Sequence, residues 1–209
     1  MKLYDMRVAP SPRRVRVFLA EKGIEIPRVE INIRAGENLA PEFLAVNPRG
    51  VLPTLQLEDG TVIDESVAIC RYFEELRPDP PLMGRTALEK AMTECWLRRV
   101  EFDAGLPVMD AFRNSYPPYA ERAVPGRAGT KAIAELAERG RARLAEFYPM
   151  IDRRLADSEH VAGPNFSIAD ITLLCIADFA RAVKLPAPDG LEHFARWHAR
   201  VSARPSATA

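Results

Sequence analysis

Two short segments in the first third of the sequence combine residue types that suit the binding of an amino acid or a small peptide. A proline stands just before a predicted strand in Leu52-Pro53, and a cis bond there would leave the Leu52 N–H and C=O free to pair with an extended peptide. Glu65-Ser66 opens a predicted helix, whose unpaired N–H groups and dipole favour a carboxylate, while an acidic side chain beside them can bind an amine. The alternative is that Glu65 and Ser66 only cap the helix.

A third polar segment, Ser167 to Asp170, stands directly before a long apolar run. Its spacing is that of a capping box, in which Ser167 is the N-cap and the Asp170 carboxylate returns to backbone N–H groups. We therefore interpret Asp170 as a capping residue and not as a catalytic acid.

Signatures of several other enzyme classes are missing from the sequence. There is no glycine-rich phosphate loop and no GxSxG motif. His193 and His198 do not have the spacing that places two metal ligands on one helical face, and His160 stands alone. We expect the histidines to be surface or loop residues and expect no metal site.

The amino-acid composition excludes further classes of protein. The 209 residues include 29 Lys+Arg and 29 Asp+Glu, so we expect no general binding to nucleic acid or acidic membranes. The 3 cysteines, Cys70, Cys95 and Cys175, form no CxxC motif, which argues against a disulfide framework. Their positions on apolar helical stripes predict core residues rather than nucleophiles. With no signal-peptide pattern and no long apolar run, we expect a cytosolic protein.

The elements that must position these segments are predicted from the periodicity of apolar residues. The first 76 residues read as β-α-β-α-β-β-α, with an Asp-Gly turn between the last two strands. The predicted strands are residues 2–4, 28–33, 54–57 and 61–63, and the predicted helices end at Gly23, lie around 41–46, and span 65–77.

The remainder of the chain is predicted to be helical. Residues 77–82 hold three prolines, which prevent a helix from continuing, and no convincing strand follows them. We predict an α/β domain over residues 1–77, a linker over 78–85 and an all-α helical bundle over 86–209. A helix over 168–179 is apolar on nearly every side, which places it at the centre of the bundle.

Four motifs in this order resemble the cytosolic glutathione transferase family over essentially the whole chain. They are the β-α-β-α-β-β-α order, Asn47-Pro48 with Gly50 ahead of Leu52-Pro53, Glu65-Ser66, and the segment from Phe166 to Asp170. The resemblance implies a thioredoxin-like amino-terminal domain that binds glutathione as co-substrate. It also implies that the helical domain supplies much of the pocket for a hydrophobic electrophile.

Binding roles carried over from the family fall on five residues. The Leu52 main-chain groups would pair with the cysteinyl part of glutathione, with Pro53 in the cis form. Glu65 and Ser66 would hold the γ-glutamyl amine and carboxylate. Asn38 falls where family members often contact the glycine end.

The residue that activates the thiol departs from the family pattern. Where the theta- and zeta-like classes carry a serine, this chain has Ala9, and Tyr4 is one step out of register and should face away. Ser11 is the remaining hydroxyl at the start of the first helix. We hypothesise that it donates to the glutathione sulfur and favours the thiolate, which is the nucleophile. The alternative is a serine that only caps this helix.

The sequence indicates the pocket for the second substrate and the oligomeric state only in general terms. Met109, Phe112, Tyr116 and Tyr119 could wall an apolar pocket over the thiol, although such a cluster is also common in plain cores. The family likeness implies a homodimer.

Two further functions stay open beside glutathione conjugation. One is a glutathione-dependent disulfide or peroxide reductase, although dithiol exchange by the protein itself is excluded because Ala9-Pro10-Ser11-Pro12 carries no cysteine. The other is a non-catalytic ligand- or protein-binding module. Arg13, Arg14 and Arg16 stand where cations oppose the dipole of the first helix, and they either assist an anionic ligand or form a solvated basic face.

Overall fold

The amino-terminal part of the chain is a mixed sheet of four strands in the order β2-β1-β3-β4. In this computed structural model, which describes residues 1–209, β1 runs parallel to β2 and antiparallel to β3, and β3 and β4 form a hairpin. The elements are β1 (Lys2–Asp5), α1 (Pro10–Glu21), β2 (Arg28–Glu30), α2 (Pro41–Leu44), β3 (Thr54–Gln56), β4 (Val62–Asp64) and α3 (Ser66–Leu76).

Sheet register follows from burial of one face. Leu3 pairs with Leu55, and both side chains are completely buried beneath the helices. The predicted strand at 28–33 is too long, because β2 ends at Glu30. β2 is an edge strand whose only neighbour, β1, ends at Asp5; the Ile31 N–H makes one last bond to the Asp5 carbonyl, and the chain beyond it has no partner.

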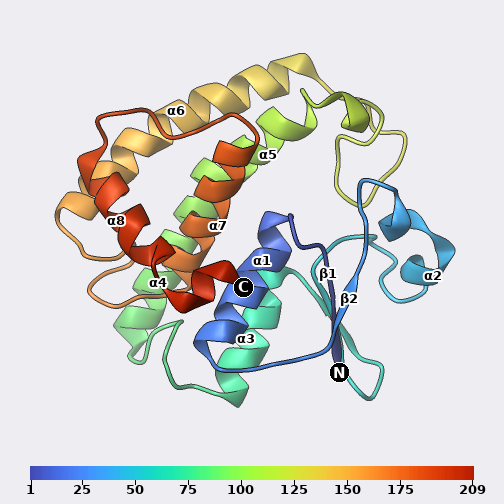
Figure 1. Cartoon of the computed structure of the whole chain (residues 1–209), viewed down its shortest axis with the longest axis horizontal. Coiled ribbons are helices and arrows are strands. Elements are labelled where there is room, and N and C mark those ends of the chain that lie inside the picture. The colour runs from blue at the N-terminus through green and yellow to red at the C-terminus, as the bar shows by residue number, and fades with distance from the viewer.

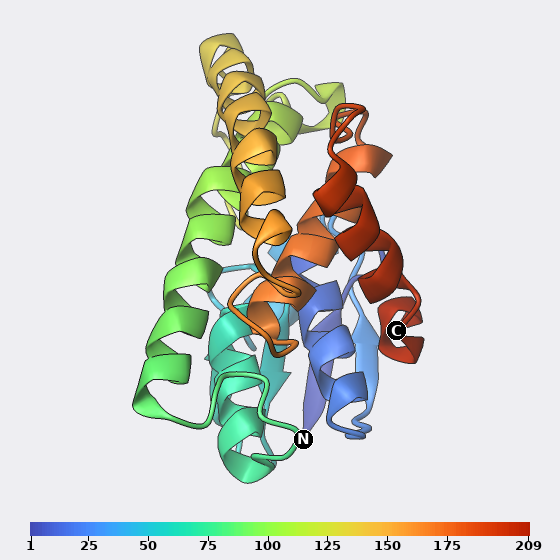
Figure 2. The ribbon, with the colours of Figure 1, turned by 90° about the vertical axis from the view of Figure 1, so that its left-hand side faces the viewer.

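The rest of the chain is helical, and the predicted fold class is confirmed. The only strand-like pairing beyond residue 76 is an isolated bridge between Arg122 and Thr130. Figure 2 shows α4 and α5 following one another along one rod, with α6 beside them. The helices are α4 (Ala87–Val100), a π-helical turn (Glu101–Gly105), α5 (Leu106–Arg113), α6 (Ala134–Ala156), α7 (Ile168–Ala182) and α8 (Glu192–Ser202), followed by a 3-10 turn (Pro205–Thr208).

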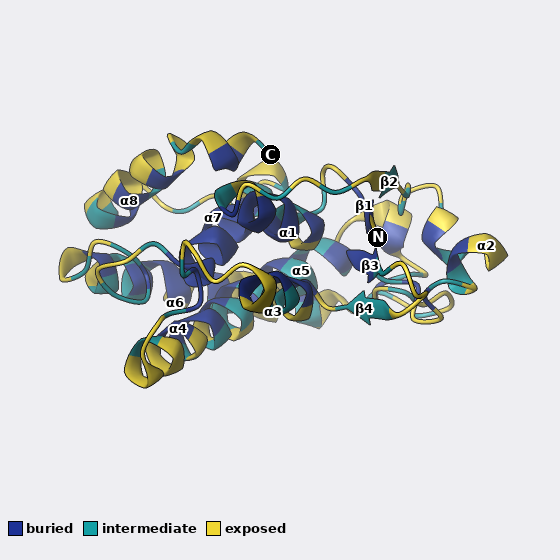
Figure 3. Cartoon of the chain, turned by 90° about the horizontal axis from the view of Figure 1, so that it is seen from below, coloured by how far each residue is buried: buried dark blue, intermediate teal, exposed yellow.

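The helices α1 and α3 lie between the sheet and the helical part, whereas α2 lies on the other side of the sheet (Figure 1). α7 packs against both α1 and α4 and is buried on nearly every side, as its apolar sequence predicts (Figure 3). One apolar core runs from Leu3 and Phe18 through Ile69 to the residues of α7. Because this core is continuous, the sheet and the helices hold each other in a fixed arrangement.

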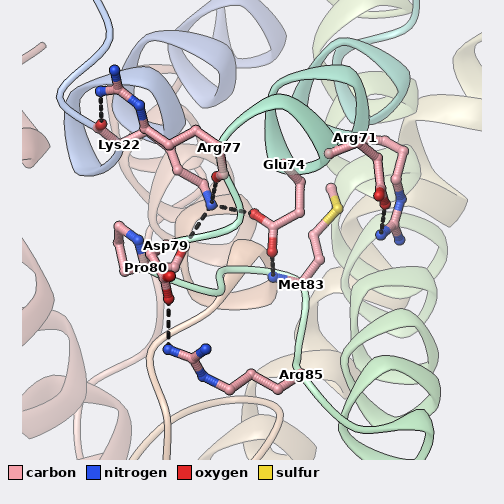
Figure 4. Close-up of polar contacts among 9 residues, drawn as sticks. Lys22, Arg71, Glu74, Arg77, Asp79, Pro80, Met83 and Arg85 are labelled. Atoms are coloured by element: carbon pink, nitrogen blue, oxygen red, sulfur yellow. Dashed lines mark hydrogen bonds and ion pairs between the residues drawn. The ribbon is translucent and has the colours of Figure 1, made fainter.

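The segment between α3 and α4 is fastened by a buried cation. The Lys22 ammonium, at the end of α1, is fully buried and pairs with Glu74 of α3 at 2.5 Å (Figure 4). It also donates to the carbonyls of Arg77 and Pro80, and Glu74 in turn accepts from the Met83 N–H. These contacts satisfy both charges and hold the proline-rich segment against α1 and α3.

The capping box that opens α7 is confirmed and does more than cap. The Asp170 carboxylate, completely buried, accepts hydrogen bonds from the Ser167 N–H and hydroxyl, the Val161 N–H and the Trp197 indole. It therefore ties the start of the central helix to the preceding loop and to α8.

We predict that removal of this carboxylate destabilises the whole molecule. Asp170→Ala leaves buried donors without a partner and should cost about 3 kcal/mol of unfolding free energy, whereas Ser167→Ala removes a cap and should cost about 1 kcal/mol. Urea unfolding followed by circular dichroism measures both. Equal losses in the two variants would contradict the assigned roles.

Candidate functional site

A single large cavity opens where the sheet domain meets the helices. Its volume is about 790 Å³. One wall comes from the start of α1, the loop before β3 and the start of α3, and the other from the π-helical turn, α5 and α7. Residues from both parts of the chain therefore face one space. Among them are five that the sequence indicates, namely Ser11, Leu52, Pro53, Glu65 and Ser66.

The start of α1 presents one hydroxyl and one N–H to this cavity. Ser11 is the second residue of the helix, is exposed, and its hydroxyl has no hydrogen-bond partner within the protein. Pro10 and Pro12 have no N–H, and the Arg13 N–H bonds to Ala9, so only the Ser11 N–H remains free in this turn. Because the two prolines lack an N–H, the free hydrogen-bond donors in this turn are those of residue 11.

The loop before β3 presents unpaired main-chain groups. The Leu52-Pro53 bond is cis, as predicted, and no hydrogen bond within the protein engages the Leu52 N–H or C=O. Both residues line the cavity. This is the arrangement with which an extended peptide can pair.

Glu65 has an unusual backbone conformation at the start of α3. Its φ is 67°, in the left-handed region that few residues other than glycine adopt, and this costs roughly 1 kcal/mol. The side chain is 66% exposed and pairs with Arg49 at 2.9 Å. Ser66, the first residue of the helix, is buried. Strain retained at a cavity wall is typical of ligand-binding positions.

Arg14 links the start of α3 to the helical part of the molecule. Its Nη1 donates to Ser66 Oγ at 2.9 Å and to Glu101 Oε1 at 2.7 Å. The side chain is buried and lines the cavity, and its Nε has no partner. The sequence could not show this link because Glu101 lies far along the chain.

All three arginines of the α1 opening turns are paired, so the prediction of a solvated basic face is wrong. Each guanidinium meets a carboxylate from a different element, and these pairs offset the repulsion between cations and the amino-terminal end of the helix dipole. The pairs are Arg13–Asp178 at 2.8 Å, Arg14–Glu101 at 2.7 Å and Arg16–Asp5 at 2.5 Å.

The apolar wall of the cavity comes largely from the π-helical turn and the residues after it. Phe102 and Leu106 are half exposed and line the cavity beside Met109. Pro107, near the start of α5, cannot donate a backbone hydrogen bond, which is one cause of such turns. Of these three, the sequence indicated only Met109; Pro107 within an amphipathic run is the signal that could have indicated the other two.

The aromatic cluster lies beside this cavity rather than in it. Phe112 and Tyr119 line a smaller adjoining space of about 150 Å³ that shares Ser11, Leu52 and Met109 with the large one. Tyr116 lines neither of these two spaces; it stacks on Phe112 with ring centroids 5.2 Å apart. A place for Tyr116 in the pocket wall therefore stays a prediction.

Two residues near the first strand and the loop before α2 are engaged within the protein. Asn38 is buried, lines the smaller space, and its Nδ2 donates to the Gly50 carbonyl at 2.8 Å, while its Oδ1 has no partner. Tyr4 lines neither space; its hydroxyl donates to Gln56 and its ring contacts Phe43. Asn38 thus supports the loop that leads to Leu52.

The cysteines differ in their surroundings. Cys70 and Cys175 are buried, but Cys95 is only partly buried, so its predicted place in the core is wrong because that face of α4 is open. Cys175 also lines the large cavity. Burial raises the pKa of the Cys175 thiol to about 11, which keeps it neutral near pH 7 and makes it a poor nucleophile.

The histidines lie away from both cavities. All three are partly buried: His160 lies in the loop before α7, His193 lies on α8, and His198 lies on α8 against Asp178. No group of three or more side chains is arranged to hold a metal ion. None of the helices is both long and apolar enough to cross a membrane.

Fold and site together define a thioredoxin-like domain followed by a helical domain, with a binding cavity at their junction. Residues 9–76 match the family model "Glutathione S-transferase, N-terminal domain", and residues 107–205 match "Glutathione S-transferase, C-terminal domain". The chain belongs to the glutathione S-transferase family.

Individual relatives agree over nearly the full length. The chain is 37% identical to Glutathione S-transferase 2 of Saccharomyces cerevisiae, over 99% of this chain and 87% of the relative. It is 29% identical to the transferase GstA of Escherichia coli, over 90% of this chain and 87% of that protein. The crystal structure of Gtt2 from Saccharomyces cerevisiae superposes with a TM-score of 0.91 at 36% identity, covering 99% of this chain and 98% of that one.

A close approach of backbones beside the cavity gives a testable prediction. A Cβ on Gly126 would lie 2.0 Å from the Arg49 carbonyl oxygen, in the loop that leads to Leu52, whereas a Cβ on Gly129 would meet nothing within 4 Å. Both glycines have positive φ, at 71° and 69°. Gly129→Ala should cost about 1 kcal/mol of unfolding free energy, and Gly126→Ala about 3 kcal/mol because it adds an overlap.

Glutathione affinity should fall in the Gly126→Ala variant only, because the Leu52 loop must shift. Calorimetric titration with glutathione measures this. A Gly126→Ala protein as stable and as tightly binding as Gly129→Ala would show that the two loops do not support each other.

Proposed function

We propose that the cavity binds glutathione with its sulfur beside Ser11 and conjugates it to an apolar electrophile. The chain is a glutathione S-transferase, an enzyme that uses glutathione as co-substrate. One observation carries the assignment of residues: Ser11, Leu52, Pro53, Glu65 and Ser66, which come from three separate segments, all line one cavity.

Glutathione is an extended tripeptide, and the wall offers groups for two of its parts. The unpaired Leu52 N–H and C=O suit the main chain of the cysteinyl residue. The exposed Glu65 carboxylate suits the γ-glutamyl ammonium, and the α3 helix end with Ser66 suits its carboxylate. Asn38 and the Gly50 loop would lie toward the glycine end.

Ser11 would act on the sulfur through two donors. Its hydroxyl and its N–H, both unpaired, can donate to the thiolate, and the α1 dipole adds to this stabilisation. The pKa of the bound thiol falls, so more of it is thiolate at neutral pH. The thiolate attacks an electrophilic carbon, a carbon–sulfur bond forms, and the leaving group departs with the bonding electron pair.

The electrophile would lie against the apolar wall formed by Phe102, Leu106 and Met109, with Phe112 behind it. Such a surface excludes water and favours an apolar body without selecting a particular compound. Removal of reactive compounds is the role that this pairing of a broad apolar wall with a thiolate supports. The cysteines are unpaired, which fits a reducing, cytoplasmic location.

Conjugation is favoured over the two alternatives. The curated relatives that match over nearly the whole chain are named as transferases rather than as reductases or binding modules. A module without catalysis would not need the strained Glu65 or the free donors at Ser11. We further propose that residues 1–77 form the glutathione-binding domain, 78–85 the linker and 86–209 the domain of the electrophile.

A homodimer is supported by an apolar stripe along α4. Leu88 is 72% exposed and Met92 39% exposed, and Cys95 follows at helical spacing. The stripe continues to Phe102 and Leu106 at the cavity mouth. A second copy of the chain would cover the part formed by Leu88 and Met92 and leave Phe102 and Leu106 to the cavity.

The Ser11 assignment predicts a specific loss of rate. Ser11→Ala removes one of two donors and should lower kcat with a chloronitrobenzene electrophile about 10- to 100-fold, with a higher thiol pKa for bound glutathione. Ser202→Ala, on the exposed end of α8, serves as the matched control. Full turnover and an unchanged thiol pKa in Ser11→Ala would remove Ser11 from the mechanism.

The dimer surface predicts a change in mass. Replacing both Leu88 and Met92 by Glu should shift the particle from two chains to one in light scattering, because buried carboxylates would have no partner. Ile133→Glu, an exposed apolar position outside the stripe, should not alter the mass. A double variant that remains a dimer would show that the interface lies elsewhere.

A further inference from the structure

The first turn of α1 is fastened to the helical part of the chain through Arg13, two residues after Ser11. Arg13 Nη1 donates to Asp178 Oδ2 of α7 at 2.8 Å, and its Nη2 donates to the Ala207 carbonyl at 2.9 Å. Figures 1 and 2 both show the segment that contains Ala207 lying beside α1. One side chain therefore connects the catalytic helix to two distant segments.

Asp178 is the centre of this group. Its Oδ1 contacts His198 Nε2 of α8 at 2.8 Å, and Arg181 lies 3.7 Å from the same oxygen. Burial alone would raise the pKa of the Asp178 carboxyl, but the hydrogen bonds from His198 and Arg13 outweigh it and hold that pKa below its ordinary value. The group is therefore a carboxylate at neutral pH, with both oxygens engaged.

Arg13 makes the only side-chain hydrogen bond between this turn and α7, although the two helices also pack against each other. α1 has no side-chain N-cap and no acidic residue in its first turn. Arg14 connects to Ser66 and Glu101 at the cavity, while Arg16 connects to Asp5 within the sheet domain. None of Arg13, Asp178 and His198 lines the large cavity or the smaller space beside it.

We propose that Asp178 is a positioning residue for thiol activation: through Arg13 it holds the first turn of α1 so that the Ser11 donors face the glutathione sulfur. This rests on the proposed function. Loss of the contact lets the turn shift relative to Leu52 and Ser66, which stay in place. Small misplacements of a reacting group cost rate far more than they cost binding.

A positional role of Asp178 and a purely electrostatic role predict opposite changes in the pKa of the bound glutathione thiol. If Asp178 acts through position, its removal weakens donation from Ser11 and raises the pKa of the glutathione thiol. If only charge mattered, removal of a carboxylate would leave Arg13 unbalanced near the sulfur and lower that pKa. A titration of the thiolate absorbance with bound glutathione distinguishes the two.

The experiment compares Asp178→Asn, Asp178→Glu and Arg181→Gln in the full chain. We expect Asp178→Asn to lower kcat about tenfold, to raise the bound thiol pKa by about one unit, and to change the KM for glutathione less than about twofold. Asp178→Glu keeps a carboxylate and should restore most of kcat. Arg181, which is 71% exposed, is the control for the charges around Asp178: Arg181→Gln removes a cation 3.7 Å from that carboxylate but leaves the Arg13 contact, so kcat and the thiol pKa should stay close to those of the wild type.

A second variant separates loss of the contact from misfolding of the Asp178 variants. Arg13→Gln breaks the same contact without leaving an arginine unpaired, and it should reproduce the loss of kcat and the higher thiol pKa. Wild-type kcat and thiol pKa in Arg13→Gln, or a lowered thiol pKa in Asp178→Asn, would overturn the inference. Wild-type protein that neither binds glutathione nor turns over would overturn the proposed function and this inference with it.

Discussion

Charge neutralisation at the start of α1 is the constraint on which the rest of the structure depends. Arginine side chains in the opening turns of a helix oppose its dipole, and Arg14 and Arg16 are buried here. Each needs a carboxylate, and the carboxylates come from β1, the π-helical turn and α7. The Arg16 pair lies within the sheet domain, but the Arg13 and Arg14 pairs form only when the helical part is docked on it, so the free donors of Ser11 reach their place only in the assembled molecule.

The same arrangement explains why the cavity lies at the domain junction. Glu101 is both the partner of Arg14 and part of the cavity wall, and the π-helical turn that presents it also presents Phe102. One turn of backbone therefore sets both the partner of Arg14 and part of the apolar wall. Lys22 and Glu74 fix the opposite end of α1 in a similar way, through the segment between α3 and α4.

Local signals made part of this site predictable. Leu52-Pro53 and Glu65-Ser66 act through the backbone of their own segments, so residue types and spacing suffice to indicate them. The pairing of Arg13 with Asp178 joins residues 165 positions apart and leaves no trace in periodicity. Cys95 was misplaced for a related reason: periodicity shows which face of a helix is apolar, but not whether another element covers it.

A structure of the protein with bound glutathione is the decisive measurement, because it locates the sulfur. We predict the sulfur within hydrogen-bonding distance of the Ser11 hydroxyl or N–H, with the cysteinyl main chain on Leu52 and the γ-glutamyl group at Glu65 and Ser66. A sulfur held away from α1, for example against Cys175 on the opposite wall, would contradict it.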